Sequence, residues 1–283
     1  MAAPDAAAHA RRGPVADPPP DPAPRIDTTV PHNARIWNYW LGGTDHHPVD
    51  REMGERIRAL FPEIADNARA DRDFLARAVR HLVTACGVRQ FLDVGAGLPT
   101  RDNTHEVAQR LAPDARVVYV DNDASVLAHA RALLTGTAEG ATAYLHADLR
   151  DPDRILAGAA RTLDLDRPVG LMLLGVTAFV DDDAEVHRAV DTLLGALAPG
   201  SHLVVSHPTD ALDPVRAREV RDAWNARGTP KLTLRGPDRI AALFRGNRLL
   251  DPGVVSCSLW RPDHPGATGV RPVDEYGGVG RLP

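Results

Sequence analysis

From position 88 onward, short apolar runs alternate with amphipathic segments along the chain. This alternation is typical of βαβ units, in which buried parallel strands are connected by helices. Two later apolar runs flank Asp251-Pro252-Gly253 and predict a pair of strands joined by a turn, so that the sheet ends antiparallel. The pattern therefore predicts an α/β fold with a doubly wound, mostly parallel sheet of seven strands. These strands are expected at about 90–94, 116–120, 142–146, 169–175, 202–206, 249–250 and 254–260.

Capping residues mark the helices between these strands. Asn103 and Glu106 form a capping pair for a helix over 104–111. Asp123 is expected to cap the next helix, and Asp151 precedes a proline at the first position of the third. Later helices are predicted from about 181, over 214–227 and over 237–244.

The N-terminal part of the chain has a different pattern. Residues 31–87 show a helical apolar period in three segments and predict a helical cap or lid segment. The first segment, 34–41, ends at Gly42-Gly43, the second begins at Pro48 and the third ends at Gly87. Residues 1–30 are rich in Ala and Pro and cannot offset their ordering entropy, so we predict a disordered tail.

Composition narrows the class of protein. The net charge is -5 and the basic residues form no stripe, so no nucleic-acid partner is expected. No apolar run approaches the roughly 20 residues that span a bilayer, and none is expected to enter a membrane. Cys86 and Cys257 are isolated and predict two reduced, buried thiols, which suits a cytoplasmic location.

A small-molecule site is predicted where the first strand ends. The apolar run there breaks into Gly95-Ala96-Gly97, with Asp93 two residues before the first glycine. Glycines let the backbone turn tightly and approach a ligand closely. A dinucleotide fingerprint would place a third glycine at position 100, which is Thr100. The loop therefore favours S-adenosylmethionine over NAD, with a purely structural turn as the remaining alternative.

Acidic residues also follow the second and third strands, at the edge where parallel sheets bind ligands. Asp121 lies 24 residues after Gly97 and can accept hydrogen bonds from both ribose hydroxyls. Asp148 can accept from an adenine amine, and Leu149 can stack on the base or donate its amide. Asn122 and Gly175 complete the predicted cofactor set along this edge. Each acid could instead be a helix cap.

The order of these motifs, Asp93–Gly97, Val118–Asp123 and His146–Asp151, resembles class I S-adenosylmethionine-dependent methyltransferases. The resemblance is closest to a bacterial family of predicted methyltransferases catalogued as a domain of unknown function, and it covers residues 31–283. It implies a Rossmann-like methyltransferase domain over 88–283, S-adenosylmethionine as cofactor and a small-molecule methyl acceptor. The shared motifs are Ala34–Tyr39, Leu41–Gly43, Leu98–Thr100, His105–Gln109, Ser206–His207 and Tyr276–Gly280.

The chain departs from this family pattern in the N-terminal segment and after the fourth strand. Thr44 and His46-His47 replace a Lys and an Asn-Phe pair, and Asp71 replaces an Asn. Val176–Ala178 replaces a Val-Leu-His type sequence. These positions lie where the resemblance places the methyl acceptor, so they bear on substrate identity and activity more than on cofactor binding.

Residues 37–47 are the predicted lid. Its aromatic rings can hold a cationic sulfonium, and Tyr39 and Gly43 are the expected cofactor contacts. His46 and His47 are candidate general bases, because histidine titrates near neutral pH, and solvated loop histidines are the alternative. Adjacent histidine rings rarely converge on one ion, so no metal site is expected. Ser206-His207 lacks the Gly-x-Ser-x-Gly context of a hydrolase.

Three functions remain open from the sequence. The leading one is an S-adenosylmethionine-dependent methyltransferase that acts on an unidentified small molecule. A non-catalytic S-adenosylmethionine-binding sensor or regulatory protein is the alternative, because no general base is evident. An NAD-dependent oxidoreductase is disfavoured by Pro99 and Thr100.

Overall fold

The computed structural model describes residues 27–133, 135–263 and 270–283. Most of the predicted tail, residues 1–26, lies outside the described residues. No helix in the described part of the chain has both the length and the apolar character needed to cross a membrane. Of the two cysteines, Cys257 is buried as predicted, whereas Cys86 is exposed, which corrects the prediction for that thiol.

The predicted α/β fold is confirmed. Seven strands are hydrogen-bonded in the order β3-β2-β1-β4-β5-β8-β6, and a further short strand, β7, pairs with β8. The first five strands are mutually parallel and β8 runs antiparallel to β5, so the sheet ends antiparallel as expected. The five parallel strands are β1 Gln90–Val94, β2 Arg116–Asp121, β3 Ala141–His146, β4 Gly170–Leu174 and β5 His202–Pro208.

The predicted pairing at the end of the chain is wrong. The runs around Asp251-Pro252-Gly253 form only β6 Arg248–Leu249 and β7 Val255–Ser256, and each pairs with β8. The strand that completes the sheet is β8, Glu275–Arg281, which the apolar pattern does not reveal. Its glycines explain why, because they interrupt the alternation of apolar side chains that marks a strand.

Close packing on both faces requires the glycines of β8. A Cβ atom on Gly277 would lie 2.8 Å from the ring of Phe74, and one on Gly280 would lie 2.8 Å from the ring of Phe244. Both rings are buried, with Phe74 on α3 and Phe244 in a 3₁₀ turn over residues 242–244. The strand therefore carries glycine because aromatic rings occupy the space on its two faces.

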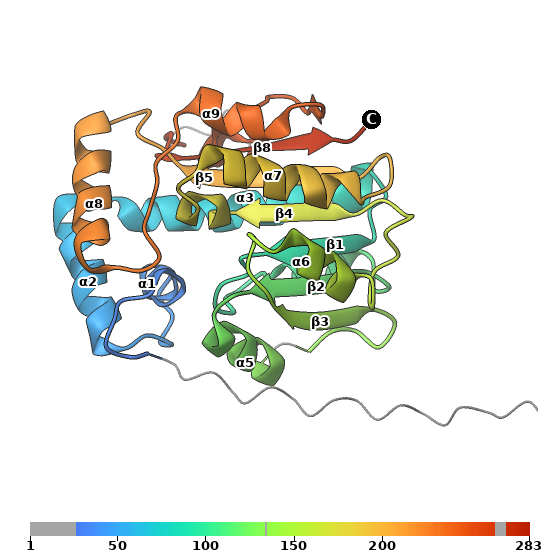
Figure 1. Ribbon diagram of the computed structural model, residues 1–283, viewed down its shortest axis with the longest axis horizontal. Coiled ribbons are helices and arrows are strands. Elements are labelled where there is room, and N and C mark those ends of the chain that lie inside the picture. Colours follow the sequence, from blue (N-terminus) through green and yellow to red (C-terminus); the bar gives the residue numbers. More distant parts are fainter. Residues whose placement is uncertain (1–26, 134, 264–269) are drawn as a thin grey trace, which may run out of the picture.

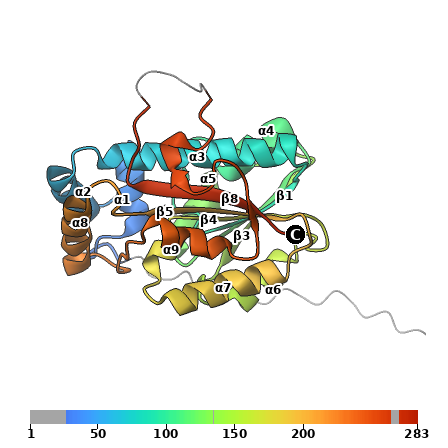
Figure 2. The ribbon, with the colours of Figure 1, turned by 90° about the horizontal axis from the view of Figure 1, so that it is seen from above.

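Helices cover both faces of the sheet. Figure 2 shows α3 (Ile64–Ala85) and α4 (Thr104–Leu111) on one side and α6, α7 and α9 on the other. Helix α4 begins at Asn103 with the predicted capping box, in which the Asn103 amide donates to the Glu106 carboxylate. The other helices of these layers are α5 Ala124–Leu133, α6 Pro152–Ala159, α7 Asp183–Gly195 and α9 Pro237–Ala241.

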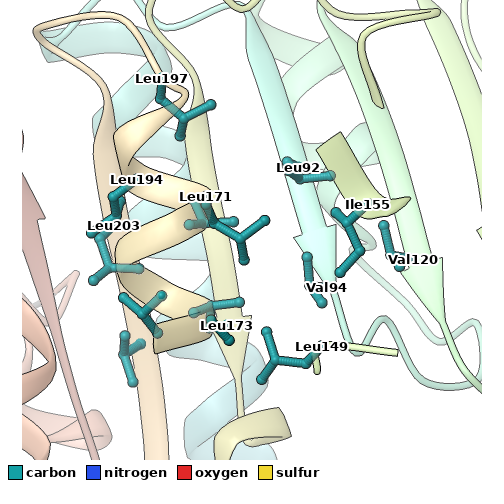
Figure 3. Packing of buried hydrophobic residues seen from close by; sticks show 14 of the residues in the cluster. Leu92, Val94, Val120, Leu149, Ile155, Leu171, Leu173, Leu194, Leu197 and Leu203 are labelled. Atoms are coloured by element: carbon teal, nitrogen blue, oxygen red, sulfur yellow. The ribbon is translucent and has the colours of Figure 1, made fainter. Parts of the chain in front are cut away.

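Two apolar cores lie between the sheet and these helices. One joins Leu92, Val94, Leu171 and Leu173 of the central strands to Ile155 and the leucines of α7, as Figure 3 shows. The other joins α3 and α4 to the opposite sheet face. Fully burying a leucine or valine side chain contributes about 1.5–3 kcal/mol, so these cores fix the strand ends firmly.

A third helical group lies beyond the carboxyl ends of the parallel strands (Figure 1). It consists of α1 Asn33–Trp40, α2 Pro48–Leu60 and α8 Pro214–Arg227, which share an apolar cluster with the first turns of α3. The buried pair Arg35 and Asp50, 2.7 Å apart, ties α1 to α2. Helix α8 comes after β5 in the chain, so this group combines the predicted N-terminal helices with a distant segment.

Candidate active site

A cavity of about 240 Å³ lies between the carboxyl edge of the sheet and the group formed by α1, α2 and α8. Its lining includes nine of the eleven residues that the sequence predicts to bind the cofactor. They come from the segments after β1, β2, β3 and β4, which are far apart in sequence. The nine are Asp93, Gly95, Ala96, Gly97, Asp121, Asn122, Asp148, Leu149 and Gly175.

The glycine loop after β1 has the open backbone that the sequence predicts. Gly95 and Gly97 have φ angles of 80° and 66°, in the left-handed region that disfavours other residues. A Cβ atom on Gly95 would lie 2.5 Å from the side chain of Val176. The amides of Gly95 and Ala96 both donate to the carbonyl oxygen of Val120, which fixes the loop against β2.

Asp121 is the acid that organises this loop. Its Oδ2 accepts a 2.9 Å hydrogen bond from the Gly97 amide, and its Oδ1 accepts one of 2.8 Å from the Asp123 amide. Burial raises the pKa of Asp121 to about 6, although the two amides partly offset the effect. Each carboxylate oxygen keeps a second lone pair, so the carboxylate can still accept from a ligand.

Asp148 is held by a neighbouring cation. Arg150 donates to both of its carboxylate oxygens at 2.8 Å, and Asn122 donates to Oδ2 at 2.8 Å. These bonds hold the pKa of Asp148 well below its usual range, with the Arg150 side chain as the main cause. The carboxylate is therefore ionised, and Arg150 also lines the cavity.

Asp93 lies at the end of β1 beneath the glycine loop and is 5% exposed. Burial raises its pKa, and a 2.6 Å hydrogen bond from the Thr104 hydroxyl offsets part of this effect. A buried carboxylate with one hydroxyl donor favours a cationic ligand group nearby.

Arg72 on α3 is a site residue that our sequence analysis missed. Its NH2 group donates to the carbonyl oxygens of Arg101 and Asp102, which fixes the guanidinium. Its buried Nε, among the described residues, has no hydrogen-bond partner, and the side chain lines the cavity. A fixed guanidinium with a free donor suits a carboxylate ligand. One feature of the sequence could have indicated Arg72. It directly follows Asp71, a polar residue that interrupts the apolar stripe of the third helical segment.

A further part of the cavity lining, which we call the acidic end, consists of Asp71, Thr209, Asp274 and Glu275. Asp71 belongs to α3 and Glu275 begins β8, paired with Pro208 of β5. All four side chains are buried, with exposed fractions of 6% or less. The sequence analysis names Asp71 only as a departure from the family pattern near the expected methyl acceptor, and it does not mention Thr209, Asp274 or Glu275.

Four predicted site residues, Tyr39, Gly43, His46 and His47, are not among the residues that line the cavity. The hydroxyl of Tyr39 donates to Glu55, and its ring contacts His46 at a centroid distance of 4.9 Å. Gly43 packs so closely on Asn38 that a Cβ atom would lie 2.3 Å from its side chain.

The second histidine of the predicted lid is at the start of α2. The His47 amide donates to Asp50, so this residue serves as the N-cap. Trp37 and Trp40, two aromatic residues of the predicted lid, both line the cavity. The structure thus brings together the strand-end residues that the sequence predicts to bind a cofactor and leaves the two candidate bases outside the cavity lining.

His207, which follows Ser206 at the end of β5, has a structural rather than a catalytic role. Its Nε2 accepts from the buried Arg235 guanidinium at 2.9 Å, and its Nδ1 donates to the Pro208 carbonyl at 2.7 Å. Burial lowers the pKa of His207 to about 3, so the imidazole is neutral at neutral pH. With both nitrogens engaged, this histidine cannot act as a base. In the described ranges, no three His, Cys, Asp or Glu side chains form a group that could hold a metal ion.

Comparison with known proteins agrees with this architecture. The chain is 42% identical to a DUF574 family protein from Streptomyces avermitilis, with a TM-score of 0.88, over 92% of this chain and all of that one. It is 37% identical to a candidate methyltransferase from Thermobifida fusca, with a TM-score of 0.82, over 89% of this chain and 95% of that one. A search of curated proteins found no match. Residues 20–283 match the S-adenosyl methyltransferase family, and the chain belongs to that family.

Proposed function

We propose that the protein is an S-adenosylmethionine-dependent methyltransferase that acts on a small molecule. The observation that carries the proposal is the link between Gly97 and Asp121, which joins an open glycine loop to a buried acid at the edge of a cavity. Family membership supports the same cofactor.

The residues at the cofactor end fit this ligand by their chemistry. Asp121 has lone pairs available for the ribose hydroxyls. Asp148 can accept a hydrogen bond from the adenine amine, and Leu149 can stack on the base or donate its amide. Arg72 offers an unpaired donor for the carboxylate of the methionine part. Asp93 offers a negative charge to the cationic groups. We assign Ala96, Asn122 and Gly175 as further contacts from their places along the same edge.

The cofactor supplies an already electrophilic methyl group, so the protein contributes mainly alignment and exclusion of water. The cavity is suited to this task because side chains of α1, α2 and α8 close it on the side away from the sheet. Trp40, Ile57 and Trp224 of this group are buried and apolar. A concave site with apolar walls and a few polar groups is typical of a small-molecule acceptor rather than a polymer.

Calorimetry on the full chain with S-adenosylmethionine, S-adenosylhomocysteine and NAD tests the cofactor. We expect both adenosyl ligands to bind and NAD to show no heat of binding. Release of S-adenosylhomocysteine from a pool of candidate acceptors then tests turnover. Binding without turnover across a broad pool would instead favour a regulatory protein, and binding of NAD alone would contradict the proposal.

A further inference from the structure

The acidic end contains three buried carboxylates that the cofactor assignment does not use, and one of them, Asp274, accepts a hydrogen bond from the Leu212 amide. Asp71 is 6% exposed and Glu275 is 2% exposed, and both line the cavity. Among the described residues, neither Oδ1 of Asp71 nor Oε1 of Glu275 has a hydrogen-bond partner, and neither side chain forms an ion pair. Burying a carboxylate without a partner is costly, so the arrangement calls for a ligand.

Neighbouring negative charges act on both Asp71 and Glu275. The charge of Asp71 raises the pKa of Glu275, in addition to the larger effect of burial. Burial likewise raises the pKa of Asp71 to about 6, and Asp93 adds to this effect. Ser206 and Arg72 offset part of the shift for Asp71, although Ser206 makes no hydrogen bond of normal geometry with it. A positive charge placed between the carboxylates would relieve both the desolvation and the repulsion.

Glu275 is distant from the glycine loop. Strand β8 is separated from β1 by β4 and β5, and three strand spacings amount to roughly 14 Å. Glu275 therefore lies well across the sheet from the residues assigned to the cofactor. Asp71 directly precedes Arg72 in α3, and both side chains line the cavity.

Part of the cavity wall is apolar. Phe61, Val220, Trp224 and Leu232 line the same cavity and belong to one apolar cluster. Resting on the proposed methyltransferase function, we propose that Asp71 and Glu275 bind a protonated amine of the methyl acceptor, whose apolar body lies against this cluster. The acceptor class is thus a small hydrophobic amine.

The same carboxylates have a second use with such an acceptor. An ammonium group has no free lone pair, so it must lose a proton before its nitrogen can react. The proton can move from the nitrogen to a carboxylate oxygen of the pair. A buried carboxylate whose pKa is raised by its surroundings is suited to hold that proton.

The test compares two probes that differ only in charge at one end. Phenethylamine carries the ammonium, and 2-phenylethanol is its neutral counterpart. Affinities are measured by NMR titration of the full chain, both free and saturated with S-adenosylhomocysteine. We expect phenethylamine to bind at least tenfold more tightly than the alcohol. Glu275→Gln and Asp71→Asn should each reduce this preference at least fivefold, whereas Glu219→Gln, an exposed site on α8, should not.

The outcomes separate the two proposals. Equal binding of the two probes by the wild-type protein would overturn the amine assignment even where S-adenosylhomocysteine binds. An amine preference that Glu275→Gln and Asp71→Asn leave unchanged would also overturn it. Weakened binding of S-adenosylhomocysteine in these variants, with the amine unaffected, would assign the pair to the cofactor instead. Failure of the wild-type protein to bind either adenosyl ligand would contradict the proposed function, while the probe comparison on the free protein would still decide the role of the pair.

Discussion

The amide of Gly97 donates a 2.9 Å hydrogen bond to Oδ2 of Asp121, which joins the loop after β1 to the end of β2. This bond sets both the shape of the loop and the direction of the carboxylate. The Asp123 amide holds the other oxygen, so the carboxylate is fixed in place before any ligand arrives. Preorganisation of this kind lowers the entropy cost of binding.

Replacing Asp121 with Asn should therefore weaken the binding of S-adenosylhomocysteine while the fold is kept. The amide NH2 group cannot accept from a backbone N–H or from two ribose hydroxyls, so we expect a loss of about 1.5–3 kcal/mol. Calorimetry gives the affinity, and circular dichroism checks the fold. Asp114→Asn, at an exposed acid before β2, is the matched control. Unchanged affinity in a folded Asp121→Asn protein would show that the ribose is held elsewhere.

Arg72→Gln should distinguish the two halves of the cofactor. If the guanidinium binds the methionine carboxylate, the variant should lose affinity for S-adenosylhomocysteine by about 1.5–3 kcal/mol. It should bind 5′-methylthioadenosine, which lacks the amino-acid part, as tightly as the wild type. Arg69→Gln, on the exposed side of the same helix, should change neither affinity. Equal losses for both ligands would mean that Arg72 supports the loop rather than the carboxylate.

The fold could be predicted from the sequence to the extent that each element has its own local signal. The five parallel strands are short, largely apolar segments, and the capping pair Asn103 and Glu106 marks the start of α4. Strand β8 could not be predicted in this way. Its Gly277 and Gly280 are required because the rings of Phe74 on α3 and Phe244 in residues 242–244 pack against them. Such a requirement depends on tertiary packing and has no local period.

The candidate site likewise contains residues that have a sequence signal and residues that have none. The residues after β1, β2 and β3 were predicted because a sheet brings the ends of its parallel strands to one edge. Glu275 was missed because its strand was missed, and Arg72 because a long helix gives no indication of which turn faces a ligand. Tyr39 was predicted as the aromatic cofactor contact of the lid, yet Trp37 and Trp40 line the cavity and Tyr39 does not. The direction in which α1 faces is decided by its packing on α2 and α3.

The assignment of His46 and His47 as general bases remains a prediction, and it requires the lid, residues 37–47, to move. Neither histidine lines the cavity, and Asn38 and Asp50 hold the segment through the amides of Asp45 and His47. On this assignment, replacing both histidines with Ala should lower turnover about a hundredfold, with cofactor affinity within a few fold.

Hydrogen exchange provides a test of the lid that needs no acceptor. A lid is ordered by the ligand that it covers, so S-adenosylhomocysteine should increase protection of residues 37–47. The segments after β1, β2 and β3 serve as the internal reference, since they are expected to gain protection in any case. Protection confined to those segments would contradict the lid and assign both histidines to the protein surface.

Because of Asp71, the free energy of unfolding should fall as pH rises, whereas a salt-bridged acid makes it rise. Its pKa is about 6 in the folded protein against an ordinary 3.8, and the charged groups facing it are Arg72, Asp93 and Glu275. Between pH 4 and 6 the folded state binds more protons than the unfolded state, so the free energy of unfolding falls as pH rises.

Asp71→Asn removes this contribution and should stabilise the ligand-free protein at pH 7 by on the order of 1–3 kcal/mol, with no gain near pH 4. Thermal unfolding of both proteins from pH 4 to 8 measures the difference, which should grow through that interval and then level off. Asp66→Asn, at an exposed acid on the same helix, should give no such rise. A lower melting temperature for Asp71→Asn than for the wild type at pH 7 would show that the carboxylate stabilises the fold. A carboxylate that serves to bind a ligand is instead expected to destabilise the ligand-free protein.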